Sequence, residues 1–279
     1  CALPISSYYT GLSLARAGIR TEQQYVEGLA NSINRVFNSP GVQFFNPIEM
    51  SRKAPFVDAA TSIDPNNFTN TFVSYYTYGS VLGLALDLSL RTRADNKNLD
   101  EFFRLFWQKY GKTEIPYSIR DIESLLIEYT DPQFASDFFN RYIYDSQMPD
   151  YEGLFRQVGV GFEQENPQQG WLGGIIRDYD GEFRLTGNAR IGTPLYEAGI
   201  QSTDKIVSVA GRRLTLGDDV QELVSNRRPG QTVNIVYERW GEEKTVRVRL
   251  AANPNYKTEL MRRASRNARD LRDAWLGTD

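Results

Sequence analysis

The stretch "SYYTYGSVLGLALDLSLR", residues 74–91, determines how the N-terminal half of the chain must be organised. Its apolar residues fall on nearly every side of a helix, which is typical of a helix enclosed by other helices. The run is too short for a membrane span, which needs roughly 20 apolar residues, and Asp87 interrupts it. We therefore expect a central helix, with Asp87 and Arg91 either paired to each other or bound to neighbouring helices.

Amphipathic helices are expected on both sides of this stretch. Thr21, followed three residues later by Gln24, forms a capping box at the start of one of them. A last short helix is expected to end at Gly159. Residues 1–159 therefore predict an all-α helical domain. The other expected N-terminal caps, chosen because their side chains accept from free backbone N–H groups, are Asn98, Ser118 and Asp131.

The sequence pattern changes in the second half of the chain. Short segments rich in β-branched residues predict strands there. Two helical segments interrupt the strands, so residues 160–255 predict a small α/β-mixed domain. A helix is expected over residues 256–279, with its arginines facing solvent and paired with Asp270 and Asp273. The expected strands are "GWLGGII" (170–176), "DKIVSVAG" (204–211), "QTVNIVYERW" (231–240) and "KTVRVRLA" (244–251), and the helices are "PLYEAGI" (194–200) and "GDDVQELVSN" (217–226).

The composition argues against several classes of function. A formal net charge of -3 argues against nucleic-acid binding, which needs an excess of basic residues to meet the phosphates. No membrane partner is expected either. With Cys1 as its single cysteine, the chain has no internal disulfide framework. The chain contains no histidine, which excludes a Ser-His-Asp triad and an HExxH zinc site within these residues. The compartment stays open between the bacterial cytoplasm and the periplasm.

The segment "IGTPLYEAGIQSTDKIVSVAGRRL", residues 191–214, resembles the PDZ domain in its bacterial, protease-associated form. The resemblance implies a small β-barrel or sandwich with two helices over residues 160–255. PDZ domains add an extended peptide to a sheet edge, and a glycine-bearing loop receives the peptide's carboxylate. Two alternatives stay open, capture of peptides by this domain or packing of the domain within the protein. The candidate peptide-binding residues are Trp171, Leu172, Gly173 and Gly174, where Gly174 replaces an apolar residue of the family pattern.

Two further segments resemble the glycyl aminopeptidase family of gluzincin zinc metallopeptidases, which carry a C-terminal PDZ domain. They are "SSYYTGLSLARAGIRTEQQYVEGLANSINRVFNSPG" (6–41) and "FVDAATSIDPNNFTNTFVSYYTYGSVLGLALDLSLR" (56–91). In that family an HExxH motif and a later glutamate hold zinc, and a glycine follows that glutamate. When this chain is aligned with the family pattern, Leu3 takes the position of the glutamate and Pro4 that of the glycine. The resemblance therefore implies zinc in a full-length parent and no metal ligand in this chain. We expect a C-terminal portion of such an enzyme, with residues 1–5 foreign or altered, rather than a natural member without its metal site.

The resemblance also implies a role for one tyrosine. Gluzincin aminopeptidases have a tyrosine three residues before a glycine at the head of a buried helix, and its phenol donates a hydrogen bond to the oxyanion. Counting back from Gly79 gives Tyr76 as the candidate catalytic residue. Tyr75 and Tyr78 are expected to be packing residues, and Tyr78 replaces the lysine of the family pattern.

The leading hypothesis is the C-terminal part of a zinc aminopeptidase that hydrolyses peptides near a free N-terminus. The helical domain would close the active site against an upstream catalytic domain, the PDZ domain would bind peptide or pack on that domain, and the isolated chain would be inactive. The alternative is a non-catalytic PDZ scaffold or adaptor that binds peptide C-termini. A third possibility, an HtrA-like serine protease fragment, requires a β-barrel where the first 150 residues predict helices.

Overall fold

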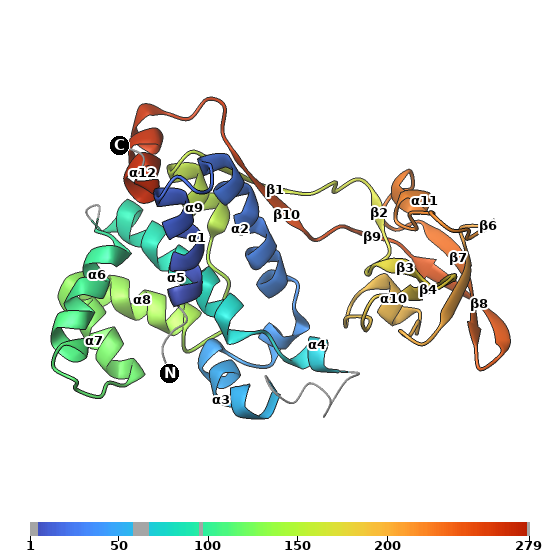
Figure 1. Ribbon diagram of the computed structural model, residues 1–279, viewed down its shortest axis with the longest axis horizontal. Coiled ribbons are helices and arrows are strands. Elements are labelled where there is room, and N and C mark those ends of the chain that lie inside the picture. Colours follow the sequence, from blue (N-terminus) through green and yellow to red (C-terminus); the bar gives the residue numbers. More distant parts are fainter. Residues whose placement is uncertain (1–4, 58–66, 95–96, 278–279) are drawn as a thin grey trace.

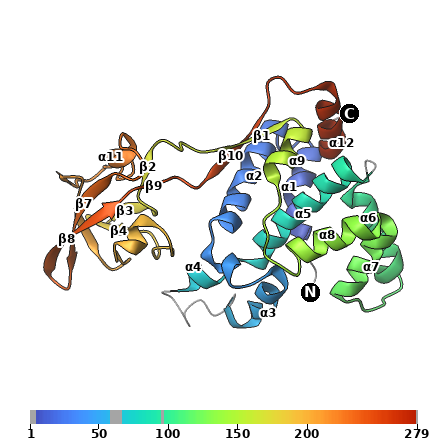
Figure 2. The same cartoon turned by 180° about the vertical axis from the view of Figure 1, so that it is seen from behind.

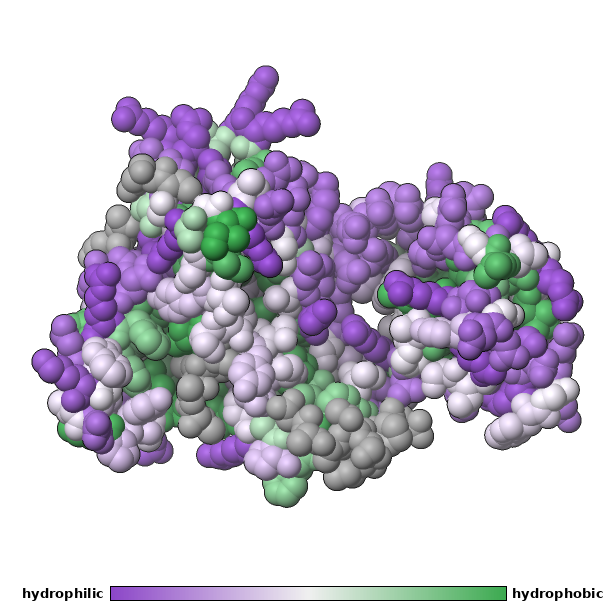
Figure 3. All heavy atoms as spheres, viewed as in Figure 1, coloured by the Kyte–Doolittle hydropathy of each residue, from purple (hydrophilic) through white to green (hydrophobic). Residues whose placement is uncertain are grey.

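The chain forms two lobes joined by a two-stranded ribbon (Figures 1 and 2). The structure, a computed structural model, describes residues 5–57, 67–94 and 97–277. The larger helical lobe contains both ends of the described chain, and the smaller sheet lobe lies between them in sequence. In the space-filling view the bridge between the lobes is mostly hydrophilic (Figure 3).

The helical lobe is built around α5 (Tyr75–Arg93). Between Tyr78 and Arg91 every residue of this helix except Ser80 is buried, which confirms the predicted central helix. The surrounding elements are α1 (Ile5–Arg16), α2 (Glu22–Phe37), η1 (Pro40–Gln43), α3 (Pro47–Val57), α4 (Phe68–Thr71), α6 (Leu99–Phe106), the π-helix η2 (Trp107–Gly111), α7 (Ile119–Tyr129), α8 (Pro132–Tyr142), α9 (Tyr151–Gln157) and α12 (Arg266–Leu276).

The predicted helix starts are confirmed by their capping contacts. The Thr21 side chain accepts from the Gln24 N–H, and the Gln24 side chain accepts from the Thr21 N–H. Each cap satisfies N–H groups that have no partner within the helix. The residues predicted to cap α6, α7 and α8 all accept from the backbone N–H three positions on, and they are Asn98, Ser118 and Asp131.

The sheet lobe has its own apolar core and a six-stranded antiparallel sheet with the order β3-β4-β5-β7-β8, where β6 pairs with β5. Two short helices pack with the sheet, as predicted. The strands of this sheet are β3 (Ile176–Tyr179), β4 (Glu182–Leu185), β5 (Lys205–Val209), β6 (Arg212–Arg213), β7 (Thr232–Arg239) and β8 (Glu242–Arg249), and the helices are α10 (Pro194–Glu197) and α11 (Glu222–Ser225). A separate pair is formed by β2 (Gly170–Trp171) and β9 (Ala251–Ala252).

The ribbon between the lobes corrects one prediction. Residues 256–260 were expected to begin a helix, but they form strand β10 (Tyr256–Leu260), paired antiparallel with β1 (Val160–Gln164). The reason is an alternating pattern in which Thr258 is buried against α2 and donates to the Val26 carbonyl at 2.6 Å. The C-terminal helix begins only at Arg266, after the Ser265 cap, and packs back on the helical lobe.

The arginines of α12 follow the prediction in part. Arg266 is exposed and lies 3.9 Å from Asp270, one of the expected partners. Arg272 instead turns inward, pairs with Glu22 at the start of α2 and donates to the Gly159 carbonyl at 3.4 Å. Since Gly159 precedes β1, this arginine holds the start of the ribbon against the C-terminal helix.

A buried polar network around Asp87 ties four helices together. The Asp87 carboxylate accepts from the Tyr8 hydroxyl at 2.6 Å, the Leu99 N–H at 2.9 Å and the Arg91 Nε at 3.1 Å. The Trp275 indole of α12 donates in turn to the Tyr8 hydroxyl at 2.8 Å. The expected Asp87–Arg91 pair is therefore confirmed, as one part of a larger network.

None of the helices in the described ranges is long and apolar enough to cross a membrane.

Removing the Asp87 carboxylate should destabilise the helical lobe. Asp87→Ala removes the buried partner of the Arg91 guanidinium and leaves it only the partly exposed Asp100 carboxylate at 3.5 Å, so we expect the free energy of unfolding to fall by about 3 kcal/mol. Urea titration followed by far-UV circular dichroism measures this. The matched control is Asp270→Ala, which removes an exposed partner of Arg266 and should cost no more than about 0.5 kcal/mol. Similar losses in the two variants would contradict this role of Asp87.

Candidate functional site

The three tyrosines at the head of α5 have different surroundings. Tyr76 is 49% exposed, and its ring packs against that of Tyr75 in a tilted arrangement, with the two centroids 4.4 Å apart. Tyr78 is only 1% exposed and packs into the core, as predicted. Successive helical residues point about 100° apart, so only Tyr76 projects away from the lobe. Tyr76 is therefore exposed at the surface of the lobe, and its catalytic role stays a prediction.

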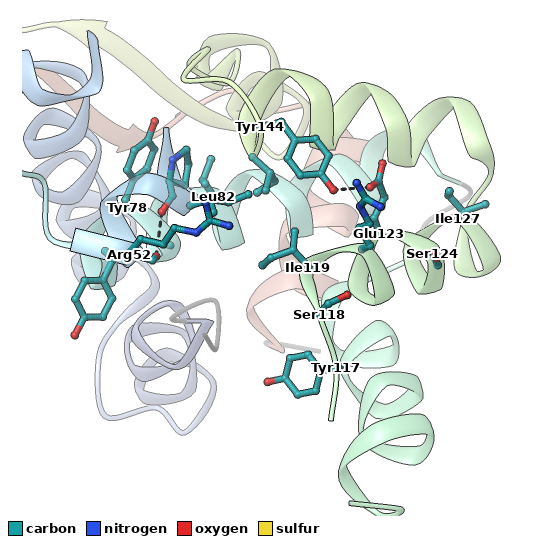
Figure 4. Close-up of a pocket in the computed structure, with 17 residues that line it drawn as sticks. Arg52, Tyr78, Leu82, Tyr117, Ser118, Ile119, Glu123, Ser124, Ile127 and Tyr144 are labelled. Atoms are coloured by element: carbon teal, nitrogen blue, oxygen red, sulfur yellow. Dashed lines mark hydrogen bonds between the residues drawn. The ribbon is translucent and has the colours of Figure 1, made fainter. Parts of the chain in front are cut away.

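A cavity of about 990 Å³ opens beside the head of α5 (Figure 4). Tyr75 and Tyr78 line it, together with residues of α3, α7 and the segment after α8, whereas Tyr76 does not. Sequence reasoning missed this cavity because its walls come from segments distant in sequence. Its polar and aromatic lining includes Arg52, Tyr117, Ser118, Glu123 and Tyr144.

Two phenols of this cavity, those of Tyr78 and Tyr144, have raised pKa values. Burial raises the pKa of Tyr78 to about 12. Burial also raises the pKa of Tyr144 to about 12, and the Glu123 carboxylate, which accepts from the Tyr144 hydroxyl at 2.6 Å, adds to this shift (Figure 4). In both cases burial is the larger cause that disfavours the ionised phenolate, and a neighbouring carboxylate, Asp145 for Tyr78 and Glu123 for Tyr144, disfavours it further.

The described residues of this chain do not fit a zinc site. The sequence has no histidine, and in the part of the chain that the structure describes no three Cys, Asp or Glu side chains are grouped to hold a metal ion. Leu3 and Pro4, predicted to stand in the register of a zinc-binding glutamate and its glycine, lie outside the described residues. We therefore derive no chemical step of this chain through a metal.

The predicted peptide-binding loop starts in β2 and is held by tight packing. Trp171 pairs with Ala251 of β9, and the buried Leu172 accepts through its carbonyl from the Leu195 N–H at 3.0 Å. Gly173 has φ 93°, and a Cβ on it would lie 2.5 Å from the Thr193 Cβ. Only glycine fits this position, because other residues add both strain and a clash.

The structure explains why Gly174 replaces the apolar residue of the family pattern. A Cβ at this position would lie 2.6 Å from Leu185 Cδ1 and 3.3 Å from Leu195 Cδ1. Leu185 and Leu195 are both buried, so their side chains already fill the space that an apolar side chain at position 174 would need.

Gln221, the residue directly before α11, also contacts this loop, and the sequence did not predict that contact. Its Nε2 donates to the Gly170 carbonyl at 2.7 Å, and its Oε1 accepts from the Leu172 N–H at 3.4 Å. The N–H groups of Gly173 and Gly174 have no hydrogen-bond partner among the described residues. The loop therefore presents two free donors, while a third is directed at a side-chain amide.

Strand β3 continues from this loop and forms an edge of the sheet. It pairs with β4 on one side, and no strand of the described chain covers its other side. The Ile175 carbonyl accepts from the Thr186 N–H of the β4 side. Because antiparallel backbone groups alternate in direction, the polar backbone groups of Ile176 and Asp178 face the free edge.

Comparison with known proteins agrees with these two lobes. Residues 5–82 match the family model of the M61 glycyl aminopeptidase, and residues 158–250 match that of the PDZ domain. The chain is also similar to the crystal structure of an aminopeptidase N family protein from Idiomarina loihiensis, with a TM-score of 0.82 and 23% identity. That likeness covers 98% of this chain and 48% of the other, so it shows the fold, and the chain spans about half the length of that protein.

Two curated relatives share a shorter region. Both are described as probable periplasmic serine endoprotease DegP-like. The protein from Hahella chejuensis is 29% identical over 98 residues, and that from Bartonella henselae is 31% identical over 97 residues. These matches cover 31% of this chain but only 21% and 19% of the relatives, so the chain spans about a fifth of their length.

The fold is a helical region that carries a PDZ domain. More specifically, the chain combines a segment of the M61 glycyl aminopeptidase family with a PDZ domain, as the sequence resemblance predicted.

The packing around Gly174 can be tested by substitution. Gly174→Ala should lower the free energy of unfolding by about 1–3 kcal/mol, because the new methyl group overlaps Leu185. Leu185→Ala in the same chain makes room for that methyl group, so the double variant should lose less than the sum of the single variants by about 1 kcal/mol or more. Urea unfolding of the four proteins measures this coupling. Additive losses would show that Leu185 does not determine the residue at position 174.

Proposed function

We propose that this chain supplies the helical and peptide-recognition parts of an aminopeptidase of the glycyl type, and that its PDZ domain binds peptides by strand addition. The family matches of the two lobes support the peptidase assignment. The peptidase activity belongs to the whole protein that contains this chain, to which the chain contributes no histidine.

The observation that carries the peptide-binding proposal is the free edge of β3 with two unpaired amides at its start. A peptide strand placed along this edge receives backbone hydrogen bonds from Ile176 and Asp178. Its terminal carboxylate lies against the N–H groups of Gly173 and Gly174, where charge-assisted hydrogen bonds hold it. To use the Leu172 N–H as well, the peptide must displace Gln221.

Tyr76 is the residue of this chain that we assign to catalysis. Its ring is half exposed at the head of a rigid, buried helix, so its position is fixed while its hydroxyl stays accessible. In the assembled peptidase the phenol donates a hydrogen bond to the oxyanion that develops at the scissile carbonyl. A non-catalytic adaptor is the second candidate function, favoured by the same free edge, and it predicts peptide binding without any effect of Tyr76.

Blocking the free edge should weaken peptide binding. Asp178→Pro removes the N–H that faces outward but no hydrogen bond to β4, so the strand itself should tolerate it. For a fluorescein-labelled decapeptide ending in valine with a free carboxylate, we expect a Kd about two- to tenfold higher. Fluorescence polarisation measures this.

The control for this experiment is Asp178→Ala, which removes the same side chain, including its contact with the Gly181 N–H at 3.1 Å, but keeps the backbone donor. Its Kd should stay close to that of the unchanged protein. An equal loss in both variants would count against strand addition, and no binding to the unchanged protein would overturn the proposed peptide recognition.

Tyr76 can be tested in the peptidase that contains this chain. Tyr76→Phe removes the phenolic donor and keeps the ring, so kcat should fall by about 10²–10³ while KM changes little. Steady-state hydrolysis of a glycyl-peptide substrate measures both constants. Tyr75→Phe is the matched control and should leave kcat unchanged. If Tyr76→Phe retains full kcat, the catalytic role of Tyr76 is wrong and the non-catalytic adaptor becomes the better-supported function.

A further inference from the structure

A second cleft lies between the two lobes, below the β1–β10 ribbon. It has a volume of about 980 Å³ and is lined on one side by α2 and the turn that follows it. Its other wall comes from the sheet lobe, including Trp171, Gly173 and Ile175 of the peptide-binding loop and the segment around Arg190. The cleft therefore reaches the same loop as the proposed strand-addition site, but from the side of the helical lobe.

The charge of this cleft is unusual for this protein. Acidic residues outnumber basic ones over the whole chain, 35 to 32, yet the described residues that line the cleft include two arginines and no Asp or Glu. The guanidinium groups of Arg35 and Arg190 make no ion pair and no hydrogen bond with other described residues. Burial lowers the pKa of Arg190, and the charge of Arg35 lowers it further, so the two cations repel each other.

Hydrogen bonds of neighbouring residues anchor the backbone beside each of the two arginines. Asn70 of α4 is 1% exposed, and its side chain accepts from the Ile191 N–H at 2.9 Å and donates to the Ala189 carbonyl at 3.4 Å. Arg190 lies between these two anchored residues. On the other wall Asn34, one position before Arg35, donates to the Tyr256 carbonyl at 2.7 Å and accepts from the Tyr256 N–H at 2.8 Å.

Arg35 and Arg190 are both exposed, and no acidic residue is found among the described residues that line the cleft. Two cations that repel each other in such a water-accessible cleft are stabilised when an anion lies between them. Guanidinium groups suit a carboxylate because their N–H donors match its two oxygen atoms. The cleft also offers apolar surface from Trp171 and Ile175 of the sheet lobe, which suits a peptide's side chains. These features favour a ligand that combines a carboxylate with an extended polypeptide.

We propose that the cleft between α2 and the PDZ domain binds a carboxylate group of a peptide ligand, held jointly by Arg35 and Arg190. This inference rests on the proposed function in that the ligand is a peptide. It adds that the helical lobe takes part in peptide recognition. The carboxylate is either the peptide's C-terminus or an acidic side chain, two sources with the same chemistry.

Three fluorescein-labelled decapeptides separate these sources. One has neutral side chains and a free C-terminus, one has neutral side chains and an amidated C-terminus, and one is amidated but contains glutamates. The double variant Arg35→Gln/Arg190→Gln should bind the carboxylate-bearing peptides about tenfold more weakly. It should bind the neutral amidated peptide as the unchanged protein does. The control is Arg213→Gln, an exposed arginine of β6 on the far side of the sheet lobe, which should change nothing.

The outcomes distinguish this proposal from strand addition. Loss of binding in Asp178→Pro but not in the double arginine variant would overturn the cleft proposal and leave the edge site standing. The reverse pattern would overturn strand addition and support the cleft. A second measurement follows the arginine Nε–H signals by NMR while the glutamate-containing amidated peptide is added. The same titration is made with the neutral peptide that has a free C-terminus. Shifts at Arg35 and Arg190 with either peptide support the cleft even without edge binding, and signals that neither peptide shifts overturn it.

Discussion

The buried Asp87 carboxylate is the interaction on which the arrangement of the molecule depends. Through Tyr8, Leu99 and Arg91 it joins α1, α6 and α5, and through Tyr8 it reaches Trp275 of α12. Because α12 comes after the sheet lobe in sequence, fixing it to the helical lobe forces the chain to return along its outgoing strand. The β1–β10 ribbon, the position of the PDZ domain and the cleft beneath the ribbon all follow from that return.

Most of the secondary structure could be predicted from local signals. Helix caps and buried helices can be recognised from short stretches of sequence, because capping and burial patterns are local. Examples are the caps Thr21, Ser118 and Asp131 and the helix at residues 74–91, which is apolar on nearly every side. Residues 256–260 could not be assigned in the same way. Their strand is stabilised by Thr258 bonding to α2 and by pairing with β1, both of which are distant in sequence.

The residues of the candidate sites also divide into those that local sequence predicts and those that it does not. The loop at residues 171–174 was found from its glycine pattern, and the structure explains its departure at Gly174 by the packing of Leu185 and Leu195. Gln221, the tyrosine-lined cavity and the Arg35–Arg190 cleft carried no signal, since each needs segments that only the folded chain brings together. Tyr76 was found only by its spacing from Gly79 in a family pattern, and its half-exposed position is compatible with the role proposed for it.

The ribbon connects the PDZ domain to the helical lobe through two paired strands rather than one. A single flexible linker would let a captured peptide explore a large volume, whereas paired strands of five residues each span about 17 Å and resist bending within the plane of the ribbon. A peptide bound to the sheet lobe is therefore kept at a high effective concentration beside the helical lobe. Under the proposed function, this connection also restricts the directions from which a peptide bound to the sheet lobe can approach Tyr76.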